Sequence, residues 1–509
     1  MSYLLGIDVG TTGVKAALFS ADGKPLGSSV EEYSLITAES GFVELDAETY
    51  WTACKKAIEK AVAEAEIDPE NIEALSISSQ GETLIALDSE GKPLRRAIVW
   101  LDNRSKEESL YLRKRFGENE VYKVTGQPRI VPTWPATKIL WLRKKEPQTF
   151  EKTHKFLLVE DYLIYKFTGK FFTEPSICSS TLLLDIRKKN WWNDMLDELG
   201  ITPDKLPTLE RSGKVIDELS RDAATQTRLS KKTKVVTGAF DQAASAIGAG
   251  NISPGTLSET TGAALAMVAT VEKPVYDPKL RIPCHVHVID DLYFLMPWCQ
   301  TAGMLLKWFR DAFCTEEKIV ENLTNIEAYK LMDKEAEKVP PGSEGLVILP
   351  HLMGAACPEF DPYASCVMFG VTLKHSKSHF IRAVMEAVAY MLRRNVEVLE
   401  ELGIEVREIR SIGGAAKSGL WARIKSDALQ KKILIPKIKD TATLGAAILA
   451  GVAAGIYSSL KSAIESMISI EEEIEPDPRN QEVYASAYEV YKRLYDALRP
   501  VFRLHAGKI

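Results

Sequence analysis

Leu-Leu-Gly-Ile-Asp-Val-Gly-Thr-Thr-Gly-Val-Lys-Ala-Ala-Leu-Phe, residues 4–19, places a glycine-rich turn between two apolar runs. The pattern predicts two antiparallel strands joined by a tight turn. Glycines let the backbone approach an anion closely, so N–H groups and the hydroxyls of Thr11 and Thr12 can face a phosphate. Asp8 precedes the turn, where a carboxylate can hold hydrated Mg²⁺, and Lys15 follows it. An ordinary β-hairpin with a polar turn is the alternative, and this stretch alone does not separate the two.

The composition narrows the class of protein. A chain of 509 residues is long enough for two or more domains, each with its own core. A net charge of −6 argues against a nucleic-acid partner, because such surfaces are normally basic. No apolar run has the length of a membrane span, and the start lacks the features of a signal peptide. Seven dispersed cysteines without a C-x-x-C pair indicate reduced thiols and a cytoplasmic location.

Two histidines near Cys284 raise the question of a metal site. His285 and His287 alternate along an expected strand, so both point to the same face. No second ligand cluster with the right spacing appears, and we therefore expect neutral strand histidines without a metal.

Strands alternate with helices along the chain, which indicates an α/β protein. Apolar residues at helical spacing predict a helix over 48–66 with Asp46 as its N-cap. A buried strand is expected at 72–78, and a strand from 235 delivers Asp241 to the start of a small-residue helix. Later elements are expected at 408–412, 420–429, 433–436, 443–451 and 482–502.

The opening hairpin has an echo in the second half. Residues 255–267 repeat the order of strand, acidic residue, Thr-Thr-Gly and apolar strand. A break rich in glycine and proline at 250–255 precedes this echo. We therefore predict two domains of related fold, 1–251 and 252–509, each with one phosphate-binding turn.

Ordered motifs extend this pattern from Gly6 to about Tyr457. Besides the hairpin, they are Gln80-Gly81-Glu82-Thr83, 98–104, 135–142, 240–244, 303–308, Asp361-Pro362-Tyr363-Ala364, 413–415 and 444–447. In these motifs the chain resembles the FGGY carbohydrate kinases of the actin-like ATPase superfamily. The resemblance implies an α/β protein of two actin-like (ribonuclease H-like) domains with an interdomain cleft. It places the sugar, the first phosphate hairpin and the catalytic Asp in domain 1–251, and the nucleotide side in domain 252–509.

The resemblance also implies a reaction, which is transfer of the γ-phosphoryl group of ATP to a hydroxyl of a small sugar or polyol with Mg²⁺. Asp241 matches the family's catalytic base, although a helix N-cap is its alternative reading. Asp8 matches the carboxylate associated with the metal. The nucleotide-side matches are Thr11, Thr12, Gly13, Lys15, Gly262, Gly303, Lys307, Gly413, Gly414 and Ser418. Lys15 stands where many relatives have Arg, Ala263 where some have Thr, and Lys307 where Gln is usual.

The acceptor-side matches are Gln80, Glu82, Asp102, Trp134, Asp241 and Gln242. A carboxylate such as that of Glu82 can accept two vicinal hydroxyls. Glycerol kinases have Arg before this Glu and xylulokinases have Met-His nearby, whereas this chain has Gly81-Glu82 and matches neither. Trp134 is as consistent with core packing as with stacking on a sugar, and Asp102 with a structural ion pair to Arg104 as with sugar binding.

These observations predict an ATP-dependent kinase for a pentulose such as xylulose. A kinase of glycerol or another polyol is the first alternative, and an actin-like chaperone or filament protein is the second. The expected partners are ATP and a small sugar, without nucleic acid or membrane, and the oligomeric state stays open, with a homodimer among the alternatives. Because the echo carries Ala263, we expect the first hairpin to make more of the phosphate contacts than the second.

Overall fold

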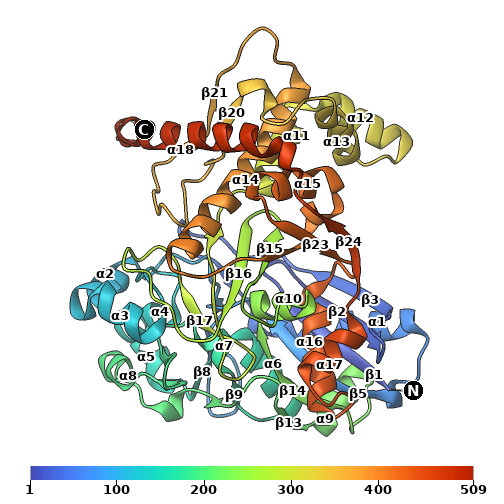
Figure 1. Cartoon of the computed structure of the whole chain (residues 1–509). Coiled ribbons are helices and arrows are strands. Elements are labelled where there is room, and N and C mark those ends of the chain that lie inside the picture. The colour runs from blue at the N-terminus through green and yellow to red at the C-terminus, as the bar shows by residue number, and fades with distance from the viewer. Residues whose placement is uncertain (1, 508–509) are drawn as a thin grey trace. The chain divides into compact units, whose positions relative to one another are not determined.

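The computed structural model describes residues 2–507, which form two compact units (Figure 1). Unit 1 comprises the chain up to Ile252 with Thr270–Leu295 and Asp440–Ser469. Unit 2 comprises Ser253–Ala269, Met296–Lys439 and the chain from Ile470 onward. The sequence division placed both of the later unit 1 segments in the second domain.

Unit 1 is built on a mixed sheet in the order β13 (Val215–Glu218), β14 (Lys234–Phe240), β5 (Ile72–Ser79), β1 (Tyr3–Val9), β2 (Gly13–Ser20) and β3 (Pro25–Glu32). Strands β14, β5 and β1 run parallel, whereas β2, β3 and β13 pair antiparallel. The short strands are β4 (Glu44–Leu45), β6 (Ile85–Leu87), β7 (Ala97–Ile98), β8 (Lys155–Leu157), β9 (Phe172–Thr173), β10 (Leu184–Asp185), β11 (Asn190–Trp191), β12 (Thr208–Leu209), β17 (Cys284–Val286) and β18 (Tyr293–Leu295).

The helices of unit 1 cover both faces of this sheet, as parallel strands require. They are α1 (Ala47–Ala65), α2 (Lys106–Phe116), α3 (Glu118–Thr125), α4 (Pro135–Lys145), α5 (Pro147–Lys152), α6 (Val159–Thr168), α7 (Pro175–Cys178), α8 (Asn193–Leu199), α9 (Arg221–Thr227), α10 (Asp241–Gly248), α16 (Thr441–Ala453) and α17 (Leu460–Met467). Helix α1 packs in one core with Leu5 and Ile7 of β1. Helix α16 packs against β1, β5 and α10 on the other face.

Glycines bring α16 unusually close to its neighbours. A Cβ at Gly6 would lie 1.9 Å from the carbonyl oxygen of Thr443, and one at Gly445 would lie 1.9 Å from that of Ala244. Such separations are too short for any side chain, so backbone packs directly on backbone here. The predicted small-residue helix at 443–451 is confirmed, and these contacts explain its composition.

Gly445→Ala is expected to destabilise the protein by about 2–3 kcal/mol, because the new methyl group would force α16 away from α10. The matched control is Gly419→Ala at the start of helix α15 (Gly419–Leu429), where the nearest atom to an added Cβ is 4.0 Å away. That variant should be neutral or stabilising by about 0.5 kcal/mol. Urea unfolding measures both, and equal stabilities for the two variants would refute the packing argument.

Unit 2 has a sheet with the strand order β16 (Leu265–Val271), β15 (Thr256–Thr261), β22 (Glu408–Ile412), β23 (Lys432–Pro436) and β24 (Ile470–Ile474). Its other elements are β19 (Trp298–Cys299), β20 (Val347–Leu349), β21 (Val367–Phe369), α11 (Gly303–Phe313), α12 (Thr315–Thr324), α13 (Ala328–Glu337), α14 (Lys377–Glu401), α15 and α18 (Gln481–Ala506). The hairpin β15–β16 pairs antiparallel and β15 pairs parallel with β22, as β1 does with β2 and β5 in unit 1. The two hairpins therefore occupy equivalent places in their sheets.

Two local predictions have clear outcomes. Asp46 does occupy the N-cap position of α1, but its side chain makes no capping hydrogen bond, because the carboxylate pairs with Arg96 at 3.2 Å instead. Burial lowers the pKa of His285 and of His287 to about 3, which agrees with neutral side chains, although His287 follows the strand β17 and does not lie in it. Within residues 2–507 no group of three His, Cys, Asp or Glu side chains is arranged to bind a metal, and no helix is apolar and long enough to cross a bilayer.

Candidate active site

Three strand ends assemble the polar residues of unit 1. Strands β1, β5 and β14 are parallel neighbours, so their carboxyl ends meet at one edge of the sheet. Asp8 is near the end of β1, Gln80 follows β5, and Asp241 follows β14. This edge is where open α/β sheets bind ligands. The sequence indicated each residue separately, and the strand order brings them together.

Asp8 is held by a neighbouring strand. The hydroxyl of Ser78 on β5 donates to Asp8 Oδ1 at 2.7 Å. Burial raises the pKa of Asp8 to about 6, and the Ser78 hydrogen bond opposes that rise. The carboxylate is half-buried and mostly ionised at neutral pH. This donor fits Mg²⁺, which prefers oxygen ligands and commonly takes one or two carboxylates together with water and phosphate.

The turn after Asp8 is closed by a hydrogen bond from Gly10 N to Gly13 O at 2.9 Å. Thr12 is exposed, whereas the indole N–H of Trp100 donates to Thr11 Oγ1 at 2.9 Å. Because Thr11 Oγ1 already accepts this bond, its own hydrogen is free to point toward an anion. Trp100 belongs to the 98–104 motif, but sequence reasoning did not connect it with the turn.

Lys15 forms an ion pair with Asp440 at 2.7 Å, at the start of α16. The ammonium group of Lys15, which we expected to act on the phosphate, is therefore already paired with a carboxylate of unit 1.

Asp241 is the first residue of α10, and Phe240 takes the N-cap position. Its Oδ1 accepts from the backbone N–H of Gln242 at 2.7 Å. Burial, together with the charges of Asp8 and Glu82, raises the pKa of Asp241 to about 8. The side chain of Asp241 is half-buried. Asp8, Glu82 and Asp241 are therefore three carboxylates of unit 1 whose charges interact. Interacting carboxylates of this kind are typical of groups that exchange protons.

The loop after β5 presents Glu82 in an unusual conformation. Glu82 has a φ of 60°, and Thr83 N donates to Gly81 O at 2.8 Å, which closes a three-residue turn. Burial raises the pKa of Glu82 to about 7, against a hydrogen bond from Ser180 and the charge of Lys138. A Cβ at Gly81 would lie 2.8 Å from the Ser180 hydroxyl, so a larger residue there would have to displace that side chain.

Gln80 precedes this turn and is buried. Its amide nitrogen donates to the Tyr50 hydroxyl at 3.2 Å, whereas its carbonyl oxygen has no partner among the described residues. A buried acceptor of this kind is suited to a ligand hydroxyl. Gln242 is half-buried beside Asp241.

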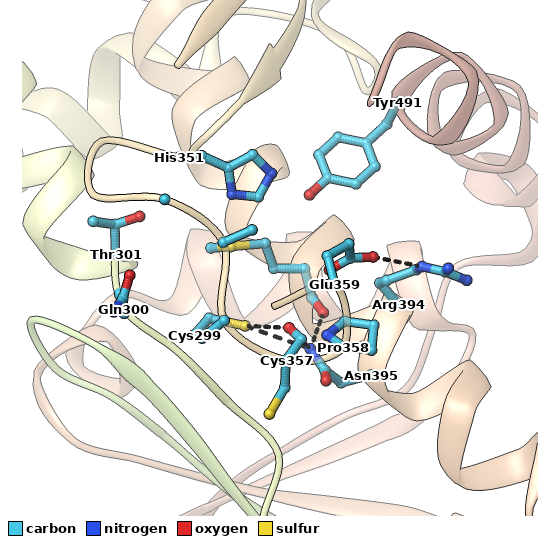
Figure 2. Close-up of a pocket in the computed structure, with 14 residues that line it drawn as sticks. Cys299, Gln300, Thr301, His351, Cys357, Pro358, Glu359, Arg394, Asn395 and Tyr491 are labelled. Atoms are coloured by element: carbon cyan, nitrogen blue, oxygen red, sulfur yellow. Dashed lines mark hydrogen bonds and ion pairs between the residues drawn. The ribbon is translucent and has the colours of Figure 1, made fainter. Parts of the chain in front are cut away.

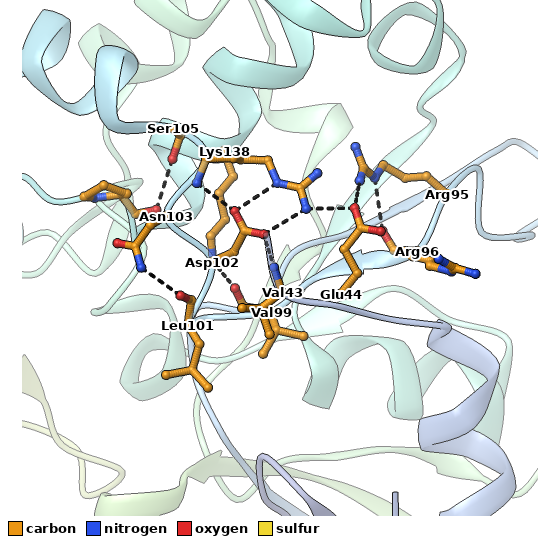
Figure 3. A network of polar contacts seen from close by, with 12 residues as sticks. Val43, Glu44, Arg95, Arg96, Val99, Leu101, Asp102, Asn103, Ser105 and Lys138 are labelled. Carbon is orange, nitrogen blue, oxygen red and sulfur yellow. Dashed lines mark hydrogen bonds and ion pairs between the residues drawn. The ribbon is translucent and has the colours of Figure 1, made fainter. Parts of the chain in front are cut away.

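Asp102 belongs to a buried ion-pair network in unit 1, drawn in Figure 3. It accepts from the guanidinium of Arg104 at 2.8 and 2.9 Å and from Val43 N at 2.6 Å. Arg104 also binds Glu44 at 2.7 Å. The ion-pair alternative therefore describes the geometry of Asp102. Trp134 is the N-cap residue of α4, packs against the core, and donates its indole N–H to Arg129 O at 2.7 Å.

Unit 2 brings three of the expected nucleotide-side glycines together. Gly303 N donates to Gly262 O at 2.9 Å, and a Cβ on Gly303 would lie 2.3 Å from that oxygen. Gly413 has a φ of 81°, and a Cβ there would lie 3.0 Å from Thr261 O. The turn of the second hairpin, the start of α11 and the loop after β22 therefore meet, with Gly262 and Gly414 exposed.

Two other expected residues of unit 2 have partners already. Ser418 caps α15 by accepting from Trp421 N at 3.1 Å. Lys307 is exposed on α11 and pairs with Asp311 at 2.7 Å.

Glu259, the acidic residue of the repeated hairpin at 255–267, has a different environment from Asp8. Glu259 is fully buried and accepts from Lys425 at 2.6 Å, from Thr261 at 2.6 Å, and from Ser411. It is therefore a structural anion inside unit 2, whereas Asp8 is half-exposed. Sequence reasoning missed Lys425, although a lysine among the apolar positions of an expected helix is a usable signal.

A small pocket in unit 2 is lined by none of the expected site residues (Figure 2). The side-chain amide of Asn395 donates to Cys357 O at 3.3 Å and to Cys299 Sγ at 3.4 Å, and Arg394 pairs with Glu359 at 3.0 Å. Thr301, two residues before Gly303, donates to Pro350 O at 2.7 Å. These contacts fix the segment that leads into α11.

Residues 3–248 match the N-terminal domain of the FGGY family of carbohydrate kinases, and residues 260–454 match its C-terminal domain. This chain belongs to the FGGY family of carbohydrate kinases. It is 31% identical to a xylulose kinase of Bacillus subtilis over 97% of both chains. It is 32% identical to a gluconokinase of the same organism over 88% of this chain and 87% of that protein. The crystal structure of ligand-bound xylulose kinase from Lactobacillus acidophilus superposes with a TM-score of 0.89, at 27% identity and 98% coverage of both chains.

Membership of this FGGY family confirms the predicted two-domain α/β fold and the kinase activity. The chain is a sugar kinase with ATP as the expected phosphoryl donor, and the chaperone or filament alternative is thereby excluded. Relatives named for xylulose and for gluconate are about equally similar. The family therefore leaves the acceptor sugar undecided.

Proposed function

We propose that this FGGY kinase transfers the γ-phosphoryl group of ATP to a hydroxyl of a neutral sugar, in particular a pentulose such as xylulose. The meeting of Asp8, Gln80, Glu82 and Asp241 at the carboxyl ends of β1, β5 and β14 is the observation that carries this proposal. Phosphoryl transfer depends mainly on positioning and on stabilisation of charge, with one carboxylate that accepts the hydroxyl proton. Asp241 is assigned that role.

The other residues of unit 1 support this reaction in distinct ways. Asp8 is assigned to Mg²⁺, which when bound would neutralise charge on the phosphates. Thr11 offers a hydroxyl hydrogen that Trp100 leaves free, and the turn offers backbone N–H groups. In unit 2, the exposed Gly262 and Gly414 allow close approach of a nucleotide to the backbone.

The charges around the acceptor residues favour a neutral sugar over a sugar acid. Asp8, Glu82 and Asp241 interact electrostatically, and each of them repels a carboxylate on the substrate when it is ionised, as Asp8 mostly is at neutral pH. The cation that acts on Glu82 is Lys138, which is fully buried and donates to two backbone carbonyls. The side-chain carbonyl oxygen of Gln80, which has no partner among residues 2–507, can accept a hydrogen bond from a hydroxyl but repels a carboxylate.

Glycerol or another polyol is the second candidate, because the carboxylate of Glu82 can accept two vicinal hydroxyls. A Cβ at Gly81 would lie 2.8 Å from the Ser180 hydroxyl and 3.0 Å from the Phe240 ring, so the arginine that glycerol kinases carry at this place would have to displace these side chains. The Asp361 segment does not add support, because its carboxylate accepts from Tyr495 and Tyr363 inside unit 2. The pentulose is therefore preferred.

An ADP-coupled assay over D-xylulose, D-ribulose, glycerol and D-gluconate tests the acceptor. A neutral ketose is expected to have the highest kcat/KM. D-gluconate should be at least about 100-fold poorer, because like charges in one site cost several kcal/mol. D-gluconate as the best acceptor would refute the proposal, and glycerol as the best would replace the pentulose with the second candidate.

The pH dependence tests the assigned base. Asp241 must be deprotonated to accept the hydroxyl proton, and burial raises its pKa to about 8. The value of kcat/KM is therefore expected to fall as the pH drops from 8 toward 6 and to level off above 8. This ratio is the quantity to measure, because it reports ionisations of the free enzyme. Glu82 and Asp8 titrate nearby, so the profile gives apparent values for the group. A profile that is flat between pH 6 and 8 would contradict Asp241 as the base.

A further inference from the structure

Lys138 is a fully buried lysine in α4 with no part in the roles assigned above. Its ammonium donates to the carbonyl oxygen of Glu82 at 2.7 Å and to that of Val99 at 3.1 Å. Figure 3 shows Lys138 beside Asp102, with its ammonium directed at the carbonyl oxygen of Val99. Burial lowers the pKa of Lys138 to about 7, and the charges of Glu82 and Asp102 oppose that effect. A buried lysine is costly, so its position calls for a reason beyond packing.

The two carbonyls differ in how much they depend on Lys138. Val99 O also accepts from Asp102 N at 3.0 Å, so that segment keeps a donor without the lysine. Glu82 is the central residue of the three-residue turn and has a φ of 60°, a conformation that is strained for a residue with a side chain. A charged donor on its carbonyl is the kind of contact that can stabilise such a turn.

We propose that Lys138 is a positioning residue for sugar binding: its ammonium clamps the strained turn at Glu82 and so aims the Glu82 carboxylate at the acceptor hydroxyls. Two neighbours limit how far the turn can relax. Gly81 packs against Ser180 and against Phe240, which precedes Asp241. Thr83 accepts from Trp100 N at 3.2 Å, on the segment that reaches Thr11. Lys138 touches neither the sugar nor the phosphate in this assignment.

The proposal rests on the role of Glu82 in acceptor binding, and a series at position 138 tests it. Lys138→Met removes the donor, Lys138→Gln keeps a short neutral donor, and Lys138→Arg keeps the charge. The KM for the acceptor should rise about 10- to 100-fold in the Met variant, because small misplacements of a binding group have large effects. The rise should be smaller in the Gln variant and smallest in the Arg variant. The kcat and the KM for ATP should stay within about threefold of wild type.

Lys145→Met is the matched control, since Lys145 is exposed on the same helix and pairs only at 3.7 Å with Glu107. Amide hydrogen exchange over residues 80–84 should be faster in the Met variant than in this control. If Lys138→Met fails to fold, the Gln and Arg variants still decide the order of KM values. The series uses whichever acceptor the wild-type enzyme prefers, so a wrong assignment of the pentulose leaves it intact.

An acceptor KM that stays unchanged across the folded variants would overturn the proposal, even with faster exchange, because Lys138 would then be structural only. Unchanged exchange at 80–84 would overturn it as well, including in the case where no sugar of the panel is phosphorylated. A rise in the KM for ATP that equals the rise for the acceptor would also contradict it, since a clamp on Glu82 acts on the sugar side.

Discussion

Asp241→Asn is expected to lower kcat by about 10³-fold or more while ATP still binds with nearly unchanged affinity. Asparagine has the same shape as aspartate but does not accept a proton from the sugar hydroxyl. Position 241 is the first residue of α10, and its Oδ1 accepts from Gln242 N, a bond that the asparagine oxygen can also make. The fold should therefore persist. Single-turnover kinetics measures the transfer step, and calorimetric titration measures ATP binding.

Asp194→Asn is the matched control for this variant. Asp194 is also an acidic residue in the first turn of a helix, but it is exposed on α8. The kcat of Asp194→Asn should equal that of wild type, because Asp194 has no assigned role in the reaction. A loss of activity in both variants would instead indicate a general loss of helix stability. Turnover within about tenfold of wild type in Asp241→Asn would show that another group accepts the proton.

Lys425→Met is expected to destabilise the protein by about 3–5 kcal/mol, since removal of one partner leaves a buried charge without compensation. Glu259 and Lys425 are both fully buried and meet at 2.6 Å inside unit 2. The hydroxyls of Thr261 and Ser411 also donate to Glu259 but carry no charge to balance it. Guanidinium unfolding followed by circular dichroism measures the loss.

Two further variants separate the charge from the packing. Arg423→Met replaces an exposed cation of the same helix and should change the unfolding free energy by less than about 0.5 kcal/mol. Adding Glu259→Gln to Lys425→Met should recover part of the lost stability, because the stranded charge is then gone. If the double variant is no more stable than Lys425→Met, the cost lies in packing.

Local signals in the sequence were sufficient for the elements of the fold. The hairpin at 4–19 appears as β1 and β2, and the expected strand at 408–412 matches β22. The helix expected over 48–66 is α1 at Ala47–Ala65. These elements follow from hydrophobic periodicity and from glycine in turns, which act over a few residues. The motif order was likewise sufficient for the family.

Local sequence patterns did not predict which polar residues contact the expected site residues. Lys15 pairs with Asp440, and Ser78 donates to Asp8, across sequence separations that no local pattern encodes. Asp8 and Glu259 stand in equivalent hairpins, yet one is half-exposed beside a serine and the other is buried against a lysine. The environment of a carboxylate depends on which distant segments pack around it.

The sequence by itself determined the secondary-structure pattern, the paired hairpins and the family with its kinase reaction, because short motifs in a fixed order carry that information. Only the tertiary structure decided which of these residues meet. The parallel order of β14, β5 and β1 places Asp241, Gln80 and Asp8 at one edge, although β5 and β14 are separated by more than a hundred residues. Likewise, the contact between Lys138 and the turn at Glu82 forms only because α4 packs against that loop. Contacts of this kind arise from the packing of whole elements, and the spacing of residues along the chain does not contain them.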